Sequence, residues 1–85
     1  MRLLIHRSAC KHGINDEDIQ HAIDHALHIE DIDEDKVLYL GWDTATNLLE
    51  IVSYFPVDDL EIVVHAMPMR TRYESLLPNP GDPHD

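Results

Sequence analysis

The sequence predicts an α+β fold of two layers, in which N-terminal helices pack on a three-stranded antiparallel meander and a short helix follows. Apolar residues between positions 19 and 27 have the spacing of a helix that buries one face. Three runs rich in β-branched and aromatic residues come next, and the links between them are short enough for hairpins. We expect one domain over residues 1–77, because a chain of 85 residues is short. The proline-rich residues 78–85 are expected to be a flexible tail.

The first elements are expected to be short. Residues 2–6 favour an edge strand, which is a candidate fourth strand of the sheet. Residues 8–12 favour one helical turn, which Gly13 would end in the left-handed conformation. A longer helix is predicted over residues 16–28, because Asn15 is a good N-cap and three acidic residues follow it. We expect this helix to pack Ile19, Ile23 and Leu27 on the sheet and to leave His21 and His25 in solvent.

The meander is predicted from residues 36–42, 48–55 and 60–67. Pro68 cannot donate a ladder hydrogen bond and is expected to mark the end of the third strand. Residues 70–77 favour a short terminal helix, which the following prolines cannot continue.

Charge is distributed unevenly along this acidic chain, whose net charge is −11. Residues 1–13 contain three basic and no acidic residues, whereas residues 14–69 contain one basic and 14 acidic residues. Such a chain repels polyanions as a whole, so a general nucleic-acid coat is excluded. An anion is expected to bind only where the basic segments near the two termini meet.

Two patterns suggest metal ligands, and an exposed polar surface explains both. His21, His25 and His28 share one helix face, but ordinary pairs with acidic residues account for that spacing. The acidic run at residues 30–35 lacks the glycine and the final glutamate of a calcium-binding loop. We therefore expect no metal site, and we interpret residues 30–35 as a solvated linker between helix and strand.

The chain lacks the patterns of several other protein classes. No phosphate-binding loop, dinucleotide fingerprint or nucleophile elbow occurs, so no cofactor is predicted. Cys10 is the only cysteine, and the N-terminal apolar run is too short for export or for a membrane span. These observations predict a cytoplasmic protein that does not contact membranes.

The candidate catalytic residues follow the third strand, with a second group near the N-terminus. They are His65, Arg70, Arg72 and Tyr73, together with Lys11 and His12. Metal-independent cleavage of RNA needs a base for the 2′-hydroxyl, an acid for the leaving oxygen and cations near the phosphate. Histidine, tyrosine, lysine and arginine supply these functions. Structural roles remain open for them, since His65 can be a satisfied sheet histidine and Tyr73 can pack its ring on the sheet.

Several short motifs resemble those of a known family. They are Lys11-His12-Gly13-Ile14, Leu38-Tyr39-Leu40-Gly41, Leu49-Glu50-Ile51-Val52 and Val63-Val64-His65-Ala66-Met67-Pro68-Met69-Arg70. In this order they resemble the BrnT-like toxins of bacterial toxin–antitoxin operons, which belong to the RelE-like ribonuclease superfamily. The chain departs from the family pattern at Ile62 and Met67, where arginines are usual, and at His65, where serine is usual.

The resemblance implies the toxin-type component of a toxin–antitoxin module. It implies a cognate antitoxin protein as partner and RNA as the candidate substrate of a metal-independent endoribonuclease. The alternative is a non-catalytic protein-binding module of the same fold, with the acidic surface as its docking face. Convergence of the two basic segments would favour the nuclease, whereas their separation, or burial of His65 without access to solvent, would favour the binding module. The sequence leaves the oligomeric state open, a homo-oligomer included.

Overall fold

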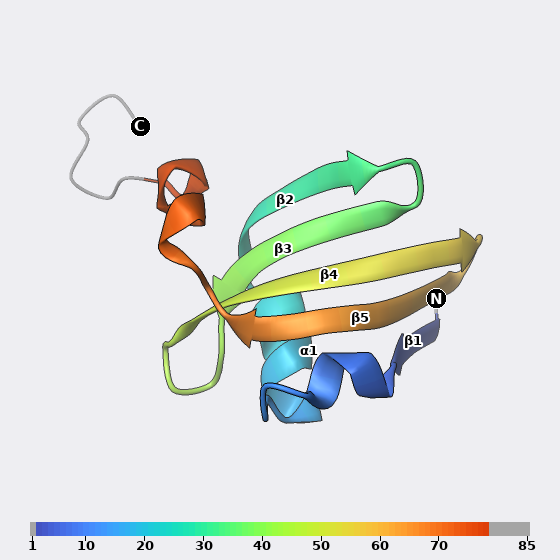
Figure 1. Cartoon of the computed structure of the whole chain (residues 1–85), viewed down its shortest axis with the longest axis horizontal. Coiled ribbons are helices and arrows are strands. Elements are labelled where there is room, and N and C mark those ends of the chain that lie inside the picture. Colours follow the sequence, from blue (N-terminus) through green and yellow to red (C-terminus); the bar gives the residue numbers. More distant parts are fainter. Residues whose placement is uncertain (1, 79–85) are drawn as a thin grey trace.

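The computed structural model describes residues 2–78 and consists of a five-stranded mixed sheet with a helix across one face (Figure 1). The strand order is β1-β5-β4-β3-β2. β1 lies parallel to β5, and all other neighbouring strands are antiparallel. In chain order the elements are β1 (Arg2–Ile5), the 3₁₀ turn η1 (Arg7–Cys10), α1 (Asp16–Asp24), β2 (Ala26–Asp33), β3 (Lys36–Trp42), β4 (Leu48–Val57), β5 (Leu60–Pro68) and the 3₁₀ helix η2 (Thr71–Leu76).

This architecture corrects the predicted fold class. The expected layer of N-terminal helices on a three-stranded meander is instead one α-helix on a sheet of five strands. The largest error concerns residues 25–33, which were predicted as the end of the helix and an acidic linker. The helix ends at Asp24, and the chain enters β2, which pairs with β3 from Ala26 opposite Gly41 to Asp33 opposite Lys36. The tail predicted from residue 78 lies, from residue 79 on, outside the described residues.

The helix spacing was misleading because Ala26 and Leu27 fit a helical stripe and also fit the start of a strand. Ala26 is half-buried against the core, whereas Leu27 is 38% exposed in β2 and does not pack under the helix as expected. The acidic residues of β2 are exposed. An edge strand tolerates such charges, because one side of it faces solvent.

Other local predictions are confirmed. The Asn15 side chain caps α1 by accepting a hydrogen bond of 2.8 Å from the Asp18 amide. Gly13 has a left-handed φ of 76°. β3 spans the predicted residues, β5 ends at Pro68, and the hairpin link between β3 and β4 falls at residues 43–47 as expected.

The connection from β1 to β2 carries α1 across the sheet, because these two strands form its opposite edges (Figure 1). Ile19 and Ala22 on α1 are fully buried against Leu49 and Ile51 of β4. Ala9 of η1 belongs to the same core, so η1 covers the core on the side next to β5.

Gly41 sets how closely α1 approaches the sheet. A Cβ atom at this position would lie 2.1 Å from the backbone oxygen of Ala22 and 3.1 Å from the Cα of Ala26. Both atoms belong to backbone that cannot turn aside, so any larger residue would displace the helix or β2. The start of α1 is held independently, since the Asp18 carboxylate accepts hydrogen bonds from the amide and the hydroxyl of Thr44.

We expect Gly41→Ala to lower the free energy of unfolding by roughly 1–3 kcal/mol or more, because forcing atoms into a packed contact is strongly unfavourable. Urea unfolding followed by circular dichroism measures the change. Gly13→Ala is the matched control, since a Cβ there meets no atom within 4 Å and tests only the left-handed backbone. A Gly41→Ala cost no larger than that of the control would contradict the close approach.

Candidate functional site

The candidate site is built on Glu50, a buried carboxylate near the start of β4, which is the central strand of the sheet. Leu49 and Ile51 point into the core beneath α1, so the side chain of Glu50 points to the opposite face of the sheet. Its side chain is 1% exposed, and Leu40 on the neighbouring strand β3, directly opposite Glu50, is fully buried. A charge in such surroundings is stable only when it is paired and hydrogen-bonded.

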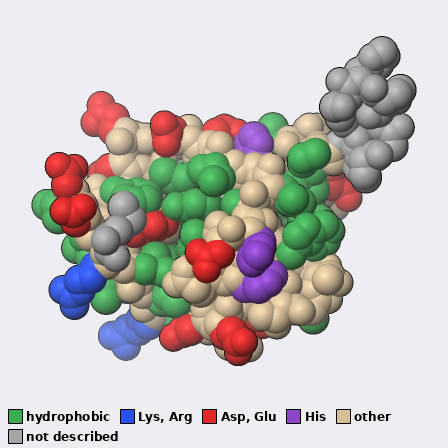
Figure 2. Space-filling view, turned by 180° about the vertical axis from the view of Figure 1, so that it is seen from behind, with side chains coloured by type: hydrophobic (Ala, Val, Ile, Leu, Met, Phe, Trp, Pro, Cys, Tyr) green, Lys and Arg blue, Asp and Glu red, His purple; other side chains and the backbone are tan. Residues whose placement is uncertain are grey.

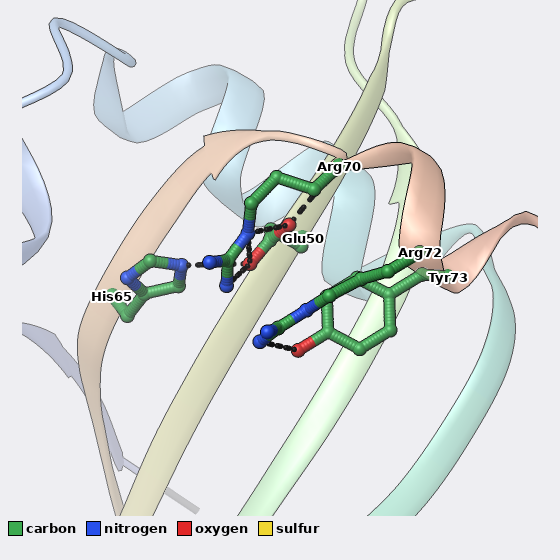
Figure 3. Close-up of polar contacts among 5 residues, drawn as sticks. All are labelled: Glu50, His65, Arg70, Arg72 and Tyr73. Atoms are coloured by element: carbon green, nitrogen blue, oxygen red, sulfur yellow. Dashed lines mark hydrogen bonds and ion pairs between the residues drawn. The ribbon is translucent and has the colours of Figure 1, made fainter.

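Arg70 and His65 supply the partners of Glu50 (Figure 3). The Arg70 guanidinium donates from Nη2 to Oε2 at 2.7 Å and from Nε to Oε1 at 3.0 Å. The Arg70 backbone amide donates to Oε1 at 2.9 Å, and His65 Nε2 lies 3.1 Å from Oε2. Both carboxylate oxygens are therefore satisfied, and the chain that follows β5 is fastened to β4.

These contacts keep Glu50 ionised. Burial raises the pKa of Glu50, but the hydrogen bonds from the side chain and backbone of Arg70 and from His65, with the charge of Arg70, outweigh it. The net result is a pKa below the ordinary glutamate value. In turn, the hydrogen bond to Glu50 raises the pKa of Arg70.

The carboxylate also determines the tautomer of His65. A carboxylate accepts hydrogen bonds only, so Nε2 of His65 carries the proton and donates it. Nδ1 of the neutral ring then holds the free electron pair, and no other group within residues 2–78 forms a hydrogen bond with it. The His65 side chain is 27% exposed, so solvent and a ligand can reach the ring.

A second histidine lies beside His65. The ring of His12, just after η1, is 6.1 Å from the His65 ring between centroids, in an edge-to-face arrangement. The Ser8 hydroxyl donates to the backbone oxygen of Val64 at 2.8 Å and fastens η1 along β5. The fold therefore brings two imidazoles together from positions 53 residues apart in the chain.

Arg72 and Tyr73 form the outer part of the site. The Tyr73 ring centroid is 4.9 Å from the guanidinium carbon of Arg72 and 5.8 Å from that of Arg70. Arg72 Nη2 also donates to the Tyr73 hydroxyl at 2.9 Å (Figure 3). Tyr73 thus lies against both arginines, which are exposed.

The structure brings together five of the six predicted site residues, although not as one cationic patch. His12, His65 and Arg70 are connected through contacts with each other or with Glu50, and Tyr73 and Arg72 continue the chain of contacts. Lys11 is exposed beside His12, and none of the ion pairs found within residues 2–78 involves its side chain. η1 runs along β5, whereas η2 lies at the end of the sheet, toward β2 and β3 (Figure 1). The two basic segments are therefore on different sides of the sheet end.

Sequence reasoning missed Glu50 as a site residue. The sequence did contain a signal, because Glu50 is the one charged residue in an otherwise apolar and polar-neutral strand. A charge at such a position demands a partner, but nothing in the local pattern indicates that Arg70, 20 residues later, provides it.

Other residues with ligand-forming side chains do not gather into a metal site in the part of the chain that the structure describes. His21 and His25 stack their rings at 4.3 Å, and Nδ1 of His21 lies 2.7 Å from the backbone oxygen of Trp42. His28 pairs with Glu30. Over residues 2–78, the structure contains no helix with the length and apolar character needed to cross a membrane.

Comparison with known proteins finds no match for this chain among protein-family models, curated proteins or solved structures.

We expect Glu50→Gln to lower the free energy of unfolding at pH 7 by about 1.5–3 kcal/mol, the usual contribution of hydrogen bonds to a charged group. The effect should depend on pH. Folding lowers the pKa of Glu50, so its stabilisation is complete above the ordinary glutamate pKa of about 4.3 and is lost as the pH falls through the lower folded value.

Urea unfolding of both proteins between pH 7 and pH 2.5 measures this dependence. The difference between wild type and Glu50→Gln should shrink as the solution is acidified. Glu17→Gln, at an exposed position on α1, is the control and should change stability little. A wild-type advantage that stays constant down to pH 2.5 would show that the charge of Glu50 does not stabilise the fold.

Proposed function

We propose that this chain is a metal-independent endoribonuclease, the toxin-type component of a toxin–antitoxin module, with His65 and His12 as its acid–base pair. The observation that carries the proposal is the His65 ring, oriented by a buried carboxylate, with a second imidazole 6.1 Å away. The resemblance of the sequence motifs to BrnT-like toxins supports the same reaction class and a cognate antitoxin as partner.

The reaction is a transesterification within RNA. Nδ1 of His65 takes the proton of a ribose 2′-hydroxyl, whose oxygen attacks the adjacent phosphorus. The bond from phosphorus to the 5′-oxygen breaks, and His12 in its protonated form gives that oxygen a proton. The products are a 2′,3′-cyclic phosphate and a free 5′-hydroxyl, and no metal ion takes part.

The cations of the site would stabilise the phosphate. Arg72 is exposed and has its guanidinium against Tyr73, so it can meet an anionic ligand without losing an ion pair. Arg70 is committed to Glu50, although its side chain is 43% exposed and retains donors that face solvent. Glu50 has a positioning role in this proposal, because its carboxylate fixes the tautomer of His65 and the orientation of the Arg70 guanidinium.

A second candidate function is a protein-binding module without catalysis. One observation in its favour is that Glu50, Arg70 and His65 satisfy one another, as the members of a structural network do. Another is that the basic residues of η1 and those of η2 do not form one cationic patch (Figure 1). The net charge of −11 also favours a basic partner over a nucleic acid.

We expect the purified protein to cleave single-stranded RNA or ribosome-bound RNA in the presence of EDTA, leaving 2′,3′-cyclic phosphate ends. His65→Asn and His12→Asn should each lower the rate by about 10²–10⁴-fold, the usual cost of losing a general base or acid. Gel analysis of end-labelled RNA measures the rate, and growth arrest on expression provides a readout in cells.

His25→Asn is the matched control, because His25 is an exposed histidine at the end of α1, away from the site. It should leave the rate within a few-fold of wild type. Folded wild-type protein that neither arrests growth nor cleaves free or ribosome-bound RNA would overturn the nuclease proposal and leave the binding module. Equal losses in all three histidine variants would also contradict the assigned roles.

A further inference from the structure

Apart from the candidate catalytic site, the surface best suited to bind a ligand consists of the open edge of β2 and the hollow beside it. β2 pairs only with β3 among the described strands, so the backbone groups along its outer side have no partner strand. Ile29 and Ile32 on this strand are 61% and 46% exposed. Exposed apolar side chains on an unpaired edge are the usual basis for adding a strand from another molecule.

The edge leads into a hollow at the end of the sheet where the turns of the β2–β3 and β4–β5 hairpins lie side by side. The hollow has a volume of about 790 Å³, and Phe55 and Val57 contribute to its apolar lining. Val57 is 63% exposed. The two hairpins are fastened here by the Phe55 amide, which donates to the backbone oxygen of Asp35 at 2.8 Å.

Charge determines what can occupy this surface. Both hairpins contribute carboxylates to the hollow, and Lys36 is the one basic residue in its described lining. The five carboxylates are Asp31, Glu34, Asp35, Asp58 and Asp59. The ion pairs found in residues 2–78 involve Glu30 and Glu50, so none of these five is neutralised by a basic side chain there. Acidic side chains gather at this end of the molecule, next to hydrophobic ones (Figure 2).

A second copy of the chain would fit this edge poorly. Pairing β2 with β2 would bring together two strands that each carry Glu30, Asp31 and Asp33, and like charges on paired strands are destabilising. A basic segment instead meets opposite charge at residues 30–33 of β2 and in the adjoining hollow. Its lysine or arginine stems can cover the apolar lining while their charged ends reach the carboxylates.

We propose that the β2 edge and the adjoining hollow dock an extended, basic and partly apolar segment of a partner protein, which pairs with β2 as a sixth strand. This inference does not depend on the ribonuclease proposal, and it specifies the docking surface that the second candidate function requires. The site lies on the opposite edge of the sheet from β1 and η1, so the partner can bind without covering His12.

The test uses a fluorescent peptide of eight alternating lysine and valine residues, the length of β2. Fluorescence anisotropy at 150 mM salt measures its binding to the full chain. We expect Asp31→Asn/Glu34→Gln to weaken binding roughly tenfold, as expected for the loss of two exposed ion pairs. Asp16→Asn/Glu17→Gln removes the same charge from the start of α1 and should weaken it less than threefold.

Hydrogen exchange identifies the binding mode. Bound peptide should protect amides of residues 26–33, and a peptide that is N-methylated at every amide, so that neither of its edges can donate, should fail to bind. Circular dichroism confirms that each variant is folded. Ile29→Ala, at a residue that is 61% exposed, should also weaken peptide binding, because it removes an apolar contact with the added strand. An equal loss of peptide affinity in the two double variants, or binding without protection of β2, would show that the attraction is only non-specific charge. Either result would overturn the proposal. Lack of binding by the unmethylated peptide would do the same.

Discussion

The contact between α1 and Gly41 is the constraint on which the rest of the fold depends. The chain must pass from β1 at one edge of the sheet to β2 at the other, and the connection contains the 3₁₀ turn η1 and one short α-helix. A helix of nine residues buries few side chains, so it has to lie very close to the strands to form a core. Gly41 allows the backbone of Ala22 to approach β3 directly, and this approach delivers Ala26 to the position where β2 begins to pair.

The two faces of the sheet have different physical characters as a result. The face beneath α1 contains the continuous apolar core, with Ile19, Leu49 and Ile51 fully buried. The opposite face has no α-helix within the described residues, and a polar network holds the end of the chain against it. Glu50 is the centre of that network, because its two oxygens join β4 to β5 through His65 and to the segment after β5 through Arg70. The same ion pair that completes the fold therefore orients the group that we propose as the catalytic base.

The two proposed sites are separated by charge as well as by position. The arginines and the His12–His65 pair lie along β5 and after it, where we propose that the RNA phosphate binds. The carboxylates collect at the hairpin turns and along β2. An anionic substrate and a basic partner segment would consequently be directed to different parts of one small domain. The net charge of −11 reflects acidic surfaces such as the hairpin turns and β2. It gives little information about the site that contains the histidines and arginines.

Local chemistry determined much of this protein. The Asn15 cap, the left-handed Gly13, the limits of β3 and the end of β5 at Pro68 all depend on neighbouring residues, and the sequence predicted them correctly. Most of the site was also visible as residue types, since His12, His65, Arg70, Arg72 and Tyr73 belong to two short segments.

The tertiary structure decided what depends on pairing between distant parts of the chain. β2 consists of acidic and apolar residues without a clear strand pattern, and it exists because β3 supplies its hydrogen bonds. Glu50 became part of the site because its burial requires the charge of Arg70, which follows the C-terminal end of β5. His12 meets His65 only because β1 and η1 run along β5, a parallel arrangement that no nearby pattern encodes. In each case the deciding energy comes from a partner far away in the sequence, so short-range patterns could not reveal it.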